Sequence, residues 1–228
     1  MRFQTALESP GSSINPQEFI STLEPSLSQG NVEEALHHVR SRWSAAQILE
    51  LLKDKSADVR KVAALALALV GDNNAVAPLA VALHDADAMV SQVAEHALWS
   101  VWFRLGSARA VQLVKCGNHH LHHGNYVCAL EKFTHAIHED PRFAEAYNQR
   151  AIAHYLCDRP EDSIADCKSA LALMPQHFGA MSGMGHCHAQ LQQWREAKHC
   201  YRLALAIHPR LEGIEGSLEE IERLLGHI

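Results

Sequence analysis

Residues 144–175 read AEAYNQRAIAHYLCDRPEDSIADCKSALALMP, and this stretch decides the fold. It ends on Pro175, and Pro141 and Pro209 stand at equal distances before and after it. Four further columns keep the same step, namely Ala136, Ala170 and Ala204; Ala129, Ser163 and Ala197; Gly117, Ala151 and Gly185; and Leu113, Tyr147 and Met181. A fixed period of about 20–50 residues indicates a repeated supersecondary unit.

The residue types in these columns indicate what the unit is. Small residues at Gly117, Ala151 and Gly185 would let two helices approach closely. Each proline would follow the second helix and block its continuation. The period therefore predicts three pairs of antiparallel helices.

This pattern resembles the tetratricopeptide repeat (TPR) from Ala110 to Leu211. It departs from that family in two columns: the usual tryptophan is Leu113, Tyr147 or Met181, and the usual tyrosine is His120, His154 or His188. The resemblance implies an all-α fold, a right-handed α-solenoid of stacked antiparallel helix pairs.

A weaker repeat with a slightly shorter step lies between Ser44 and Gly106. Its matched positions are Leu52 and Leu83, Asp54 and Asp85, Val59 and Val90, Ala63 and Ala94, and Leu67 and Leu98. With Asp58-Val59-Arg60 and Gly71-Asp72, this stretch resembles short HEAT-like repeats of the bilin-lyase type. We expect Asn73 or Asn74 to cap the helix between the two units, with Pro78 in its first turn.

Signals of a third, degenerate HEAT-like unit precede these two. Asn15-Pro16 would open one helix, and Asn31 would cap another over Val32–Arg42. The predicted organisation is a flexible tail at 1–13, HEAT-like repeats at 14–106, three TPRs at 107–211 and a capping helix at 212–228. No linker divides the halves, so we expect them to stack into one solenoid.

The expected capping helix has its own signals. Ser217 and Glu220 have the spacing of a capping box. An apolar stripe is formed by Ile214, Leu218, Ile221 and Leu225. Such a helix would cover the last repeat's apolar face, which water would otherwise reach.

Composition narrows the class of function. The net charge of −6 comes from 8 basic and 12 acidic residues in 1–106 and 12 basic and 14 acidic residues in 107–228, so we expect no nucleic-acid binding. The longest apolar runs, Val62–Val70 and Ala75–Leu83, are too short to span a membrane. Six cysteines without a C-x-x-C motif indicate reduced thiols. These features predict a cytoplasmic protein without membrane contact.

Seventeen histidines raise the possibility of a metal site, and His119, His120, His122 and His123 cluster together. However, His120, His154 and His188 are separated by whole repeats, about 8–10 Å apart, whereas metal ligands lie about 2 Å from their ion. A di-iron hydroxylase would need several His-Glu dipeptides, and the chain has only His138-Glu139. No G-x-S-x-G or H-E-x-x-H motif is present. We expect no metal, no cofactor and no catalysis.

In the TPR family the first helices line a concave groove that binds extended peptides. The matching positions here are Val114, Asn118, Leu121, Glu145, Asn148, Gln149, Tyr155, Ser182, His186 and Gln190. The resemblance therefore implies a non-catalytic scaffold or adaptor for a protein or peptide partner. Two alternatives stay open: an accessory or regulatory subunit of a stable complex, and a bilin-lyase-like cofactor-processing protein.

TPR co-chaperones that bind acidic chaperone tails use lysine, arginine and asparagine at five positions. The matching residues are Val114, Asn118, Gln149, Gly179 and Gly183, of which only Asn118 is unchanged. A carboxylate terminus needs charge-assisted hydrogen bonds when it is desolvated. We therefore expect the groove to refuse acidic chaperone tails and to prefer neutral or mildly apolar segments.

Overall fold

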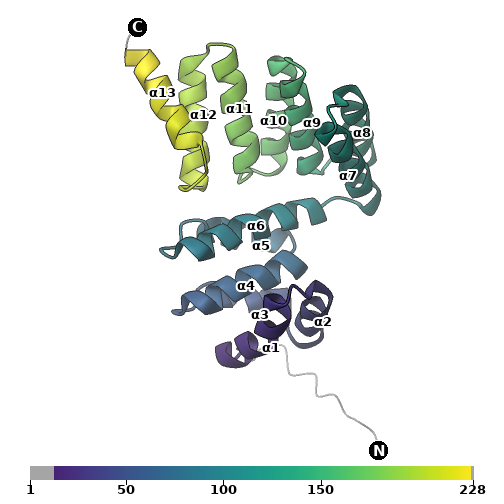
Figure 1. Cartoon of the computed structure of the whole chain (residues 1–228), viewed down its shortest axis with the longest axis vertical. Coiled ribbons are helices and arrows are strands. Elements are labelled where there is room, and N and C mark those ends of the chain that lie inside the picture. Colours follow the sequence, from purple (N-terminus) through teal and green to yellow (C-terminus); the bar gives the residue numbers. More distant parts are fainter. Residues whose placement is uncertain (1–12, 227–228) are drawn as a thin grey trace, which may run out of the picture.

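The computed structural model describes residues 13–226, and all its regular elements there are α-helices (Figure 1). They are α1 Pro16–Ser28, α2 Val32–Arg42, α3 Ala45–Leu51, α4 Ala57–Val70, α5 Asn73–Ala82, α6 Ala88–Arg104, α7 Ala108–His122, α8 Tyr126–Glu139, α9 Ala144–Leu156, α10 Pro160–Leu173, α11 Phe178–Gln190, α12 Trp194–Ile207 and α13 Ile214–Gly226. The all-α repeat fold is confirmed. The expected flexible tail lies outside the described residues, apart from Ser13.

Side-chain caps set the starts of the HEAT-like helices except α4. Asn15 accepts the backbone N–H groups of Gln17 and Glu18, and Asn31 caps α2 as expected. The cap of α5 was predicted wrongly: Asp72 accepts the N–H of Asn74, so Pro78 lies beyond the first turn. Asn74 is exposed, and water can therefore reach the carbonyl that Pro78 leaves without a helical donor.

The TPR half consists of three antiparallel pairs, α7 with α8, α9 with α10 and α11 with α12. A Cβ on Gly117 would lie 2.4 Å from Phe133, and one on Gly185 would lie 2.6 Å from Tyr201. The glycines of the small-residue column therefore mark close helix contacts in the first and third pairs, as predicted.

The last helix, α13, packs on α12. Its buried Ile214 and Ile221 share a cluster with Tyr201. Ser217, however, lies inside α13 and donates to the carbonyl of Gly213, so the predicted capping box at this residue is wrong. The helix begins earlier, at Ile214, because this residue is already part of its buried stripe.

The HEAT-like half lies across the edge of the TPR stack instead of extending it, since α6 runs along the turns that follow the second helices (Figure 1). Trp102 stacks on His177 in the turn before α11, with ring centroids 4.2 Å apart. Further along, Glu95 lies 3.1 Å from His208, which follows α12. One core cluster contains residues of both halves, from Phe19 to Phe178. The two halves are therefore joined laterally, through α6.

Candidate functional site

The ten predicted groove residues all lie on α7, α9 and α11, which are neighbours in the stack. They fall into two groups by exposure. Four are buried, namely Val114, Glu145, Asn148 and Ser182. Six are partly or fully exposed, namely Asn118, Leu121, Gln149, Tyr155, His186 and Gln190.

Glu145 is buried in a polar cluster at the start of α9. Its carboxylate lies 2.9 Å from His177 Nε2, and both side chains are 0% exposed. Gln149 and Asn148 donate to its other oxygen, at 2.6 and 3.3 Å. Because His177 Nδ1 accepts the N–H of Ala180, the proton of a neutral imidazole sits on Nε2 and is donated to Glu145. This carboxylate is satisfied internally, so its expected role in the groove is wrong.

Helix α6 covers one end of the face that α7, α9 and α11 form, at the start of α9. A Cβ added to Gly179 would lie 2.6 Å from the indole of Trp99, which fills the place of a side chain there. The half of the face nearest the starts of α9 and α11 is therefore occupied by the chain itself.

The far half of the face is open. Tyr155 on α9 is 40% exposed, and two residues that the sequence analysis missed lie beside it: Ile152, 38% exposed, and Leu156, 45% exposed. Their spacing of i, i+3 and i+4 places them on one helix face, a signal that was available in the sequence. We call Ile152, Tyr155 and Leu156 the α9 patch.

Polar groups surround the α9 patch. On α11, Gln190 donates to Asp158, and His186 contacts the Tyr201 hydroxyl at 2.8 Å. Burial lowers the pKa of His186, so this ring is neutral at pH 7. On α7, the buried Oδ1 of Asn118 has no hydrogen-bond partner within the described part of the chain. The open half thus combines apolar contact area with neutral hydrogen-bonding groups and the exposed carboxylate of Asp158.

In the three TPR pairs, acidic residues are concentrated on the second helices, α8, α10 and α12, and are nearly absent from the first helices, α7, α9 and α11. Glu145 is the only acidic residue in α7, α9 and α11, and it is buried. The acidic residues of α8, α10 and α12 are Glu131, Glu139, Glu161, Asp162, Asp166 and Glu196. Of the first-helix cations, Arg109 pairs with Glu139 and Arg150 with Asp166. Lys115 is exposed and forms no ion pair with any described residue.

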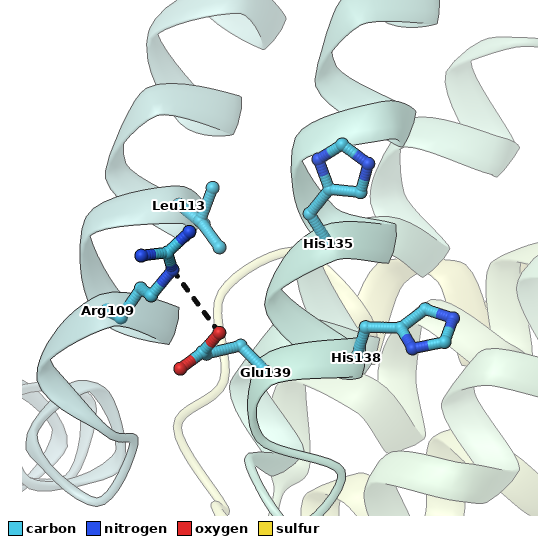
Figure 2. A pocket seen from close by; sticks show the side chains of 5 residues that line it. All are labelled: Arg109, Leu113, His135, His138 and Glu139. Atoms are coloured by element: carbon cyan, nitrogen blue, oxygen red, sulfur yellow. Dashed lines mark ion pairs between the residues drawn. The ribbon is translucent and has the colours of Figure 1, made fainter.

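Two surface hollows lie away from the predicted groove residues. One of about 260 Å³ is lined by Arg109, Leu113, His135, His138 and Glu139 (Figure 2). The Arg109–Glu139 pair, at 3.3 Å, crosses it, and Figure 2 shows His138 turned away from that pair. The other, of about 380 Å³, is lined by Val127, Leu130, Glu131, Thr134, His135, His154 and Arg159. Although three His or Glu residues line each hollow, no three His, Cys, Asp or Glu side chains within residues 13–226 are placed so that they could hold one metal ion.

Burial keeps two thiols protonated. It raises the pKa of Cys167 to about 12 and that of Cys200 to about 11. Neither sulfur is a thiolate nucleophile at neutral pH. In the region that the structure describes, no helix is both long and apolar enough to cross a bilayer.

Comparison with known sequences finds similarity in both halves. The HEAT repeats family matches residues 19–99. A DnaJ homolog subfamily C member 7 homolog from Dictyostelium discoideum is 25% identical over 95% of this chain and 41% of its own length. A TPR repeat-containing protein from Rhizobium etli is 31% identical over 36% of this chain and 41% of its own length. The chain spans less than half the length of these relatives.

Solved structures match the TPR half. The first TPR of Spaghetti (RPAP3), bound to the HSP90 peptide SRMEEVD, has a TM-score of 0.52 and 28% identity over 53% of this chain and 95% of that domain. The first TPR domain of human RPAP3 has a TM-score of 0.51 and 27% identity over 52% of this chain and 94% of that domain.

The expected refusal of acidic chaperone tails is wrong, because the similar Spaghetti domain is bound to such a peptide. The five positions at which this chain was compared with TPR co-chaperones do not include Lys115, which occupies the same repeat column as Gln149. That comparison also overlooked the burial of Glu145, which leaves no exposed carboxylate on α7, α9 or α11 to repel an acidic peptide.

The helix pairs, the small-residue column and both sets of similarities agree. The chain is a helical repeat protein in which HEAT-like repeats precede tetratricopeptide-like repeats.

Proposed function

We propose that this chain is a non-catalytic interaction scaffold that holds an extended segment of a partner protein across α7, α9 and α11. The observation that carries the proposal is the α9 patch, whose three large apolar side chains are exposed in the middle repeat. Contiguous exposed apolar groups at such a place mark binding surfaces. Gln190 is exposed on α11, and its amide oxygen can accept a backbone N–H of an extended peptide.

The Spaghetti domain, which matches the TPR half of this chain, supports this proposal because it is bound to a short peptide. The peptide SRMEEVD is accordingly the first probe for this chain. We further propose a cytoplasmic location, which the six free cysteines support because unpaired thiols are typical of reducing compartments.

Selection of a random peptide library on the full chain tests the function. We expect enriched peptides to compete with one another and to bind at least tenfold more weakly to Tyr155→Ser, because truncating an anchor removes its packing. The matched control is Val127→Ser on α8, which changes an apolar residue that is 71% exposed. Peptides that bind both variants equally, or no enrichment at all, would contradict the proposal.

A further inference from the structure

Helix α7 stands at the end of the TPR stack, because α6 crosses the edge of the stack instead of preceding α7 in it (Figure 1). Gln112 and His119 on α7 are exposed. The residues of the later repeats in the same two columns are all 0% exposed, namely Ala146, Ala180, Ala153 and Cys187. Polar side chains thus face water where the later repeats bury small ones, as at the terminus of a repeat stack.

His119 and His123 lie on this end of the stack, one helical turn apart. Both are exposed, and their ring centroids are 4.4 Å apart. Among the seventeen histidines of the chain, no other two are separated by four positions, the spacing that places two side chains on one helix face. The expectation of no metal rested on His120, whose column continues a whole repeat away. That argument does not apply to two histidines within one helical turn.

A hydrogen bond orients one of the two rings. The Nδ1 atom of His123 lies 2.7 Å from the carbonyl oxygen of His119. Because a carbonyl oxygen only accepts, Nδ1 carries the proton and donates it, and in the neutral ring Nε2 holds the free lone pair. Metal-binding histidines usually have this arrangement, with the other ring N–H donated to a carbonyl or a carboxylate. His123 is therefore preorganised to bind a cation through Nε2.

The spacing of the two rings suits one shared ion. Zinc lies about 2.0–2.1 Å from each histidine nitrogen, so two ligands at a tetrahedral angle are about 3.4 Å apart. Rings with centroids 4.4 Å apart can bring two nitrogens to that separation by small side-chain rotations. The C-terminus of α7, where His123 lies, carries partial negative charge and attracts a cation.

We propose that His119 and His123 form a bidentate site for a divalent transition-metal ion of the zinc, nickel or copper class, which imidazole ligands favour. Water or a side chain of another molecule would fill the remaining coordination positions, since no group of three suitable side chains is placed around one ion within residues 13–226. The spacing is that of the histidines in an H-E-x-x-H helix, but His120 replaces the glutamate, so the site binds without a general base. Neither histidine is among the predicted groove residues, so this inference goes beyond the proposed function.

Titration calorimetry of the full chain, purified without an affinity tag, with zinc chloride tests the site. We expect one ion per chain, bound at least tenfold more weakly by His119→Gln and by His123→Gln, because each change removes one of the two ligands. The matched control is His138→Gln on α8, which changes an exposed histidine three positions from the exposed His135. This variant should bind zinc as the natural chain does.

Zinc-induced shifts of the imidazole NMR signals of His119 and His123 give a second readout, and circular dichroism checks that each variant keeps its helices. The absence of zinc binding would overturn the inference. Zinc bound by either variant as tightly as by the natural chain, or weakened equally by His138→Gln, would overturn it too, because the ion would then be held by other histidines.

Discussion

At the scale of single residues, the Glu145–His177 pair links α9 to the turn that Trp102 covers. Glu145→Ala would leave the buried Nε2–H of His177 without an acceptor. We expect the free energy of unfolding to fall by about 2 kcal/mol or more, measured by chemical denaturation. Glu139→Ala, which removes an exposed ion pair with Arg109, should cost less than about 1 kcal/mol. Equal losses of free energy of unfolding would show that the buried pair contributes no more to stability than the exposed one.

The Arg60–Asp85 pair makes stability depend on acid pH. Two hydrogen bonds of 2.7 Å from Arg60 lower the pKa of Asp85 below its ordinary value. A lowered folded pKa stabilises the protein above the ordinary pKa of about 4, and this contribution is lost as pH falls through the folded value. The free energy of unfolding of the natural chain should therefore exceed that of Asp85→Asn by a large amount at pH 7 and by a smaller amount at pH 3. The same difference in free energy of unfolding at both pH values would show that the Arg60–Asp85 pair does not cause the pH dependence.

At the scale of elements, close packing explains the glycine column. Gly117→Ala would place a Cβ 2.4 Å from the Phe133 ring, so we expect destabilisation of about 1–3 kcal/mol. Gly216 in α13 has nothing within 4 Å of the same atom. Gly216→Ala should therefore stabilise the chain by up to about 1 kcal/mol through helix propensity. Thermal unfolding of both variants checks the opposite signs, and a stable Gly117→Ala protein would show that α7 and α8 can separate.

Local signals predicted most of the elements. The equally spaced prolines and the caps Asn15 and Asn31 were interpreted correctly, because each acts within one turn of its own helix. The errors at Asp72 and Ser217 are also local: Asp72 caps α5 in place of its polar neighbours Asn73 and Asn74, and α13 already begins at the buried Ile214, before Ser217. Sequence spacing alone does not resolve these choices.

At the scale of the whole molecule, the site was only partly predictable. Glu145 and Tyr155 share a helix and a family face, yet one is buried and the other is exposed. The difference comes from α6, whose Trp99 and Trp102 reach the turn at His177 from the other half of the chain. No periodicity within either repeat type encodes that crossing, so the closed half of the face could not be foreseen.

The same crossing predicts that both halves unfold together. In a variant with Trp43 and Trp194 replaced by Phe, the fluorescence of Trp99 and Trp102 reports on the junction, while circular dichroism reports on all helices. We expect coincident transitions from the two probes and a single calorimetric peak, because the core cluster joins the halves. Two resolved transitions, each reproduced by an isolated half, would show that the contact with α6 is too weak to couple them.

The central claim is that a partner segment occupies the half of the TPR face that α6 leaves open. Amide chemical-shift mapping of the full chain with a selected peptide tests it most directly. We predict perturbed signals around the α9 patch and residues 186–190, with little change in α8, α12 or α1 to α5. Perturbations centred on the second helices or on the HEAT-like half, with the α9 patch unaffected, would contradict the account.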